Sequence, residues 1–282
     1  MNMSLEPHML LVTCCLEQAR ADILMSVIDN LLEEQARIGL PLTDNIVVFD
    51  NASTMPKVVE RLKSTFKNTY QSNVNVGYWS AIDWFLCNLP DTAKYAYMIE
   101  SDMLHYAFHK MNRVIDFLEA NQDIGSCRLH EYSVAERHLW DKDKPVKGSK
   151  VNSLWQSHTN KVTNKPITLT QSNSDPEIFV TNFLTQMPAV NRVETLKKVI
   201  TQFHNSNGFS ERDIQAAYHH FFQKTAILDG GIFKCDERCH GLTSKSPSGS
   251  WTPTSVLDKI GYKTTRVGNI VSQAEYYVTK LT

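Results

Sequence analysis

The chain has 282 residues, with 29 lysines and arginines against 30 aspartates and glutamates, and 42% of its residues are hydrophobic. These values are typical of a globular protein with a sizeable core, and they exclude a chain that is disordered, collagen-like or coiled coil throughout. The net charge of -1 also argues against a protein that coats nucleic acid through its overall charge.

The first hundred residues alternate predicted strands with predicted helices. We expect strands at residues 9–13, 45–49, 69–71 and 94–99, and helices at 17–38, from a Ser53 or Thr54 cap to about 66, and at 79–87. The strands are continuous apolar runs, which is typical of a parallel sheet with helices on both faces. The fold class predicted from this pattern is α/β.

Ligands of such sheets bind at the carboxyl ends of the strands, and those ends carry polar residues here. They are Thr13, Asp50, Asn75 and the run Glu100-Ser101-Asp102. We expect these residues to line one cleft.

The second half of the chain follows a different pattern. We expect a polar excursion at residues 140–176, a strand at 179–186, a helix at 190–203 and short strands at 225–228 and 232–233. A helix at 210–222 opens with a predicted capping box between Ser210 and Asp213. The Ser/Gly/Pro-rich stretch 241–253 is predicted to be mobile.

Three motifs at the predicted strand ends could carry chemistry, and each also has a plain structural interpretation. Glu100 and Asp102 offer hard oxygen ligands for a divalent cation, or they are solvated acids. Asp50 can accept hydrogen bonds from a ribose or a base, or it belongs to a turn. Asn75-Val76-Gly77 precedes a helix whose N-terminus suits phosphate, or it is an ordinary glycine turn.

Taken together and in this order, the motifs resemble those of nucleotide-sugar glycosyltransferases with the GT-A fold, and the nearest type is the large inverting family 2. The resemblance covers about residues 9–105. It implies a Rossmann-like, mostly parallel sheet, a UDP-sugar donor and a Mn2+ or Mg2+ cofactor. The residues that it assigns to the nucleotide sugar are Thr13, Asp50, Asn75, Gly77, Ala81, Glu100 and Ser101.

The resemblance also implies metal ligands and a catalytic base. Asp102 and His240 correspond to the metal ligands, although Glu100 replaces the first aspartate of the family's Asp-x-Asp motif. Glu211 and Asp213 are the candidates for the base that deprotonates the acceptor. Arg212 departs from the family's adjacent acidic pair, and we favour Glu211 because Asp213 closes the predicted capping box.

The resemblance implies one GT-A-like domain over residues 1–282. Residues 1–105 form its nucleotide-sugar half, 106–240 its acceptor and catalytic half, and 241–282 a C-terminal loop and tail. Residues 137–165 hold seven Lys and Arg against two Asp, with Trp140 and Trp155 nearby in the sequence. This basic segment could hold an anionic acceptor such as modified DNA, or it is a solvated loop.

Other features indicate the compartment. No apolar run is long enough to cross a bilayer, and residues 1–7 lack the segments of a signal peptide. Six cysteines do not form a dense disulfide framework in a chain of this length, and Cys14 and Cys15 are expected to be buried thiols. We therefore expect a cytoplasmic protein without integral membrane association.

Three alternatives stay open. A sugar-phosphate nucleotidyltransferase shares the general sheet, but it needs a Gly-rich basic loop where residues 13–18 have neither Gly nor a basic side chain. A non-catalytic binding module is the second alternative. A zinc site at Cys235, Cys239 and His240 is the third, although the spacing matches no strong zinc pattern.

Overall fold

The computed structural model describes residues 7–131, 159–160, 165–166, 168–182, 188–204, 209, 211–222, 224–236, 238 and 270–282. His240, the tail at 241–253 and most of the basic segment 137–165 lie outside these residues. The predictions made for them are therefore untested.

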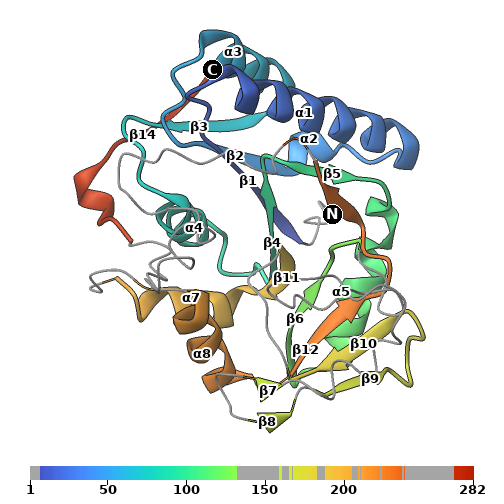
Figure 1. Ribbon diagram of the computed structural model, residues 1–282. Coiled ribbons are helices and arrows are strands. Elements are labelled where there is room, and N and C mark those ends of the chain that lie inside the picture. Colours follow the sequence, from blue (N-terminus) through green and yellow to red (C-terminus); the bar gives the residue numbers. More distant parts are fainter. Residues whose placement is uncertain are drawn as a thin grey trace, which may run out of the picture.

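A ten-stranded sheet organises the molecule, in the order β14-β3-β2-β1-β4-β11-β6-β12-β10-β9 (Figure 1). Its strands are β1 (His8–Thr13), β2 (Ile46–Asp50), β3 (Asn68–Ser72), β4 (Tyr95–Glu100), β6 (Ile124–Arg128), β9 (Leu169–Gln171), β10 (Ile178–Thr181), β11 (Ala189–Arg192), β12 (Lys224–Leu228) and β14 (Val278–Lys280). Two short antiparallel pairs join β5 (Met103–His105) to β13 (Phe233–Cys235) and β7 (Thr159–Asn160) to β8 (Lys165–Pro166).

The predicted α/β fold is confirmed. Strands β3, β2, β1 and β4 are neighbours in the sheet and are all parallel. In chain order, helices connect β1 to β2, β2 to β3 and β3 to β4. Beyond β4 the sheet is mixed, since β11 runs antiparallel to both β4 and β6, while β12 is parallel to β6. The parallel part is the half that the sequence pattern predicts.

Helices cover both faces of the sheet. They are α1 (Gln18–Ile38), α2 (Leu42–Asn45), α3 (Pro56–Thr65), α4 (Tyr78–Cys87), α5 (Met111–Ala120), α7 (Val193–Thr201) and α8 (Glu211–Phe221), with 3₁₀ turns η1 (Phe108–Lys110) and η3 (Gln273–Glu275). Figure 1 shows α1 and α3 on one side of β1–β3 and α4 on the other.

Alternate residues of β1 supply the two cores, since neighbouring side chains of a strand point to opposite faces. Leu11 belongs to the cluster that includes α1 and α3, whereas Leu10 and Val12 belong to the cluster with α4 and α7. Because β1 is buried on both faces, its sequence is apolar at every position from Met9 to Val12.

The structure corrects two details of the predicted elements. Met55 caps α3 without a side-chain hydrogen bond, so the predicted Ser53 or Thr54 cap is wrong. Residues 190–192, predicted as helix, belong to β11, and α7 begins only at Val193. Val190 pairs with Tyr97 on one side and Cys127 on the other, and this ladder outweighs the helical spacing.

The helices that the structure describes include none with the length and apolar character required to cross a membrane.

Candidate active site

The register of the sheet brings the carboxyl ends of its parallel strands to one edge. Thr13 at the end of β1 pairs with Asp50 at the end of β2, and Val12 pairs with Glu100 at the end of β4. Asp50 in turn pairs with Gln71 of β3. The predicted cleft residues Thr13, Asp50 and Glu100 therefore end adjacent strands at the same edge.

Asp50 is fully buried and holds the turn that follows β2. Its Oδ1 accepts hydrogen bonds from the hydroxyl and the backbone N–H of Ser53, and its Oδ2 accepts one of 2.7 Å from Gln71 Nε2. Burial raises the pKa of Asp50 above its ordinary value, although these three hydrogen bonds oppose the shift. Ser53 also accepts from the backbone N–H of Cys15 at 2.8 Å, which ties the ends of β1 and β2 together.

Asn51 links this turn to the predicted phosphate-binding turn. Its Nδ2 donates to Asn75 Oδ1 at 2.8 Å, and its Oδ1 accepts from the backbone N–H of Val76 at 2.7 Å. The next residue, Ala52, has a φ of 61°, a left-handed conformation that is uncommon for a residue with a side chain. Such strain occurs at functional sites, where the surroundings hold it in place.

The turn from Asn75 to Gly77 leads directly into α4. Gly77 has a φ of 85° and caps the helix, and its N–H donates to Asn75 Oδ1 at 3.0 Å. No atom lies within 4 Å of a Cβ built on Gly77, so the backbone conformation, and not crowding, requires a glycine there. Ala81, also predicted to line the nucleotide pocket, is fully buried in the core between α4 and the sheet.

Tyr78 connects the start of α4 to the acidic run after β4. Burial raises the pKa of Tyr78 well above its ordinary value, and the charge of Glu100, a hydrogen bond to the Glu100 side chain and the charge of Asp102 add to the shift. Glu100, Ser101 and Asp102 are all partly exposed, and their run bends from β4 into β5. The predicted phosphate-binding turn and the predicted metal-binding run are therefore neighbours.

Cys14 lies between these motifs. Its Sγ accepts a hydrogen bond from Asn75 Nδ2 at 3.4 Å. Burial, with the nearby charge of Asp50, raises the pKa of Cys14 to about 11, so the thiol is neutral at physiological pH. Both cysteines were predicted to be buried, and this is confirmed for Cys15, whereas Cys14 is only partly buried.

Asp236, which follows β13, lies beside the acidic run, and the sequence patterns did not point to it. Its backbone N–H donates to the backbone carbonyl of Asp102 at 2.7 Å. Its carboxylate forms two-pronged hydrogen bonds with Arg238, which hold the pKa of Asp236 below its usual value. The predicted strand at 232–233 ended too early, and only with β13 extended to Cys235 does Asp236 become an acid directly after a strand.

Asn51, Tyr78 and Gln71 were also missed as individual site residues. Each stands beside a predicted residue in the sequence or in the sheet. Their bonds to Asn75, Glu100 and Asp50 join parts of the chain that are apart in sequence, so they become visible only in the folded structure.

The candidate bases lie on α8, which begins at Glu211 as the sequence predicts. Asp213 is exposed on the first turn of this helix. Ser210 lies outside the described residues, so the predicted capping box stays a prediction. The roles of Glu211 and Asp213 also stay predictions.

The described residues contain no group of three or more His, Cys, Asp or Glu side chains that could hold a metal ion. The nearby carboxylate of Asp236 is bonded to Arg238, so the oxygen donors left for a metal are those of Glu100 and Asp102. The chemistry of these two oxygen donors fits Mn2+ or Mg2+, which keep several positions for water and phosphate oxygens. It does not fit a structural zinc site, which takes four nitrogen or sulfur ligands as a rule.

No family model and no curated protein matches the chain. Among solved structures, GalNAc-T7 with UDP, GalNAc and Mn2+ is similar, with a TM-score of 0.52 and 11% identity over 85% of this chain and 45% of that chain. This chain has the GT-A fold.

A second structure, S. aureus TarS 1–349, is also similar to this GT-A fold, with a TM-score of 0.47 and 12% identity over 81% of this chain and 59% of that chain. The chain thus spans about half the length of the two solved chains. At these identities the likeness concerns the fold.

Proposed function

We propose that this chain is a glycosyltransferase that moves a sugar from a nucleotide-diphosphate sugar, specifically a UDP-sugar, to an acceptor hydroxyl. The observation that carries the proposal is the meeting of four motifs at one edge of the sheet: Thr13, Asp50-Asn51, Asn75–Gly77 and Glu100–Asp102. The fold supports it, because open parallel sheets bind nucleotides at this edge.

Three of these motifs have separate parts in donor binding under this proposal. The Asp50-Asn51 turn faces the nucleoside, and the backbone N–H groups at the start of α4 face the diphosphate, where the helix dipole favours negative charge. Glu100 and Asp102 would hold a divalent cation, which neutralises charge on the diphosphate when it is bound. The presence of UDP and Mn2+ in the GalNAc-T7 structure supports this choice of donor and metal.

The chain's own part in transfer is to activate the acceptor. Glu211, or Asp213, takes the proton of the acceptor hydroxyl as its oxygen bonds to the anomeric carbon of the donor. The bond between that carbon and the diphosphate breaks, and the nucleoside diphosphate leaves with the bonding electrons. An attack from the opposite face inverts the anomeric centre, and this outcome is part of the proposal.

A donor screen tests the proposed activity. The melting temperature of the purified chain is measured with UDP-, GDP-, TDP- and CDP-sugars, each with Mn2+ and with EDTA. We expect one nucleotide class to raise the melting temperature in Mn2+ and slow metal-dependent hydrolysis of the best donor. If no nucleotide sugar raises the melting temperature or is hydrolysed, the proposed function is wrong.

The acceptor is proposed from charge alone. We propose an anionic acceptor, with modified DNA as one case, because seven basic residues lie between residues 137 and 165. Replacing Lys144, Lys147 and Lys150 by Ser should weaken acceptor binding and reduce its salt dependence, whereas donor binding should not change. Equal binding at every salt concentration would contradict an anionic acceptor.

A further inference from the structure

Asp83, in the middle of α4, has a buried carboxylate with two partners. Only 7% of the residue is exposed. Its Oδ1 lies 2.8 Å from His204 Nε2, and its Oδ2 lies 3.2 Å from Gln273 Nε2. An ionised carboxylate can only accept, so His204 donates from Nε2 and Gln273 from its amide nitrogen.

The two partners come from parts of the chain that are far from α4 in sequence. His204 follows α7 and is 121 residues from Asp83, whereas Gln273 belongs to η3 and is 190 residues away. One buried side chain therefore joins α4, the end of α7 and the C-terminal segment, which we define as residues 270–282.

The C-terminal segment also contacts α4 and β3 on either side of the turn that contains Asn75 and Gly77. After the turn, Ser80 Oγ accepts from the backbone N–H of Val271 at 2.9 Å. Before the turn, Asn73 Oδ1 accepts from the N–H of Tyr277 at 2.8 Å, and the N–H of Asn73 donates to the Tyr277 carbonyl at 3.0 Å. The turn is therefore held at both ends by one segment.

Aromatic packing extends these contacts toward α8. The rings of Phe203 and Phe209 are 4.5 Å apart between centroids, and Phe209 packs against Trp79 of α4 at 5.8 Å. Phe209 lies two residues before Glu211. Helix α4 therefore begins at the Asn75–Gly77 turn, and its Trp79 packs against Phe209, just before the candidate base Glu211.

We propose that Asp83 is a positioning residue, which fixes α4 against the C-terminal segment and so keeps the Asn75–Gly77 turn in the shape that binds the donor. The identity of the ligand rests on the proposed function. The physical argument is that a buried carboxylate is stable only while its hydrogen bonds are made, so its partners are held in one geometry. This fixes the geometry of the turn, because the residues on either side of it, Asn73 and Ser80, are bound to the same segment.

The test begins with Asp83→Asn, with Asp91→Asn, an exposed acid beyond the end of α4, as the matched control. The amide at position 83 keeps the shape of the side chain but carries no charge. Its hydrogen bonds to His204 and Gln273 therefore lose their charge-assisted strength, even where the Gln273 amide turns to accept from the new NH2. Hydrogen exchange of residues 73–81 should become about tenfold faster, the scale of one hydrogen bond to a charged group, while β1 and β4 exchange as before. The control should exchange as the wild type does.

A second variant keeps the test independent of a general loss of stability. In Asp83→Asn/Gln273→Glu, the amide at position 83 accepts from His204 and donates to the new carboxylate at position 273. Every hydrogen bond is thereby restored with the charge on the other residue. We expect this double variant to recover both the slow exchange of residues 73–81 and the affinity for UDP in Mn2+, which Asp83→Asn should weaken by about tenfold.

The outcomes separate the two proposals. Wild-type exchange of residues 73–81 in Asp83→Asn would overturn the positioning role. Faster exchange spread evenly over β1 and β4, with no recovery in the double variant, would also overturn it. If the exchange results hold and the wild type binds no nucleoside diphosphate, the positioning of the turn stands and the proposed function is wrong.

Discussion

The buried carboxyl group of Asp50 should make the stability of the protein depend on pH. Its folded-state pKa is raised, so the folded protein holds the proton more tightly than the unfolded chain does. The contribution of Asp50 to stability therefore falls as the pH rises from the ordinary Asp pKa through the folded one.

The direction of this pH dependence can be measured by comparing the wild type with Asp50→Asn, whose side chain cannot titrate. The amide oxygen can still accept from Ser53, and the Gln71 amide can turn to accept from the new NH2. We expect the stability of the wild type relative to the variant, measured by urea unfolding, to fall as the pH rises above the ordinary Asp pKa of about 4. A difference that does not vary with pH would contradict the raised pKa.

A second prediction for a single residue is that Asp102 binds the metal ion. Because its side chain is partly exposed, Asp102→Asn should leave the melting temperature unchanged. UDP binding in Mn2+ should weaken to the level seen with EDTA, because a neutral amide is a poorer ligand for a hard cation. Calorimetry with Asp116→Asn, an exposed acid on α5, provides the control. Equal UDP affinity in Mn2+ and EDTA for the wild type would exclude the role.

At the scale of elements, the two candidate bases occupy different positions on the first turn of α8, so different roles are expected for them. Glu211 is the first residue of the helix, next to the positive end of its dipole, which favours the ionised form that accepts a proton. We expect Glu211→Gln to lose transfer by about 10²-fold or more while donor binding and melting temperature stay unchanged.

Asp213→Asn is the matched comparison on the same helix. It should cost about 1 kcal/mol of stability and keep most of the activity, as expected of a capping residue. Transfer rates and melting temperatures of both variants show whether Glu211 or Asp213 is the base. If Asp213→Asn is folded and inactive, the two roles are exchanged.

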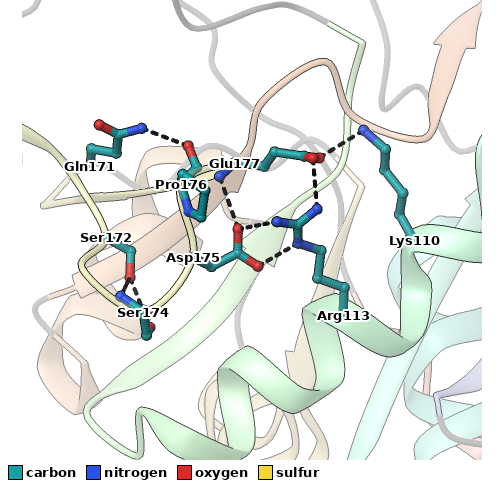
Figure 2. Close-up of polar contacts among 8 residues, drawn as sticks. All are labelled: Lys110, Arg113, Gln171, Ser172, Ser174, Asp175, Pro176 and Glu177. Atoms are coloured by element: carbon teal, nitrogen blue, oxygen red, sulfur yellow. Dashed lines mark hydrogen bonds and ion pairs between the residues drawn. The ribbon is translucent and has the colours of Figure 1, made fainter.

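A second element-scale feature is the ion-pair network that fixes the β9–β10 turn on α5 (Figure 2). Arg113 binds both oxygens of Asp175, with 2.7 Å from Nη2 to Oδ1, and its Nη1 lies 2.7 Å from Glu177. Lys110 bonds to the same Glu177 at 3.0 Å. The network anchors the chain where it returns from the predicted polar excursion.

The members of this network should contribute unequally. The Asp175 side chain is 12% exposed and would lose both hydrogen bonds from Arg113 in Arg113→Met, keeping only the one from the Glu177 N–H, which should cost about 1–3 kcal/mol. Glu177 is 41% exposed, so Glu177→Gln should change stability by only about 0–1 kcal/mol. Urea unfolding at neutral pH compares the two, and a similar cost for both would contradict the ranking.

The pH dependence of this network has the opposite sign to that of Asp50. A hydrogen bond from Lys110 lowers the pKa of Glu177. Burial raises the pKa of Asp175, but the hydrogen bonds from Arg113 and the Glu177 N–H and the charges of Arg113 and Lys110 together lower it below its ordinary value. Their contribution is present above the ordinary pKa and is lost as the pH falls through the folded pKa. The cost of Arg113→Met should therefore shrink in acid.

For the whole molecule, the sequence predicted those parts whose pattern is local. Continuous apolar runs predicted the parallel strands β1, β2 and β4, and the polar residues at their ends predicted the edge where Thr13, Asp50 and Glu100 lie. The same reasoning could not find the bond from Asp83 to His204, because no local pattern relates residues 121 positions apart. Strand β14 was missed for the same reason, since a short polar run becomes a strand only beside β3.

The elements from residue 103 to 128 were also not predicted in detail. Strand β5 has only three residues and depends on β13, which lies more than a hundred residues later. Strand β6 contains Gly125 and Ser126 and is buried at every position, so its sequence lacks the strong apolar run of β1. Tertiary pairing selects the strand conformation at both places.

The position of β14 has a consequence for how the protein is made. Tyr277, just before β14, bonds to Asn73, 204 residues earlier, so the outer edge of β3 is covered last. At ordinary rates of synthesis the ribosome needs about 10–40 s to add that length of chain. Throughout this time the nascent protein presents an open strand edge that can pair with another chain. A chaperone that covers this edge during translation should therefore raise the yield of folded protein.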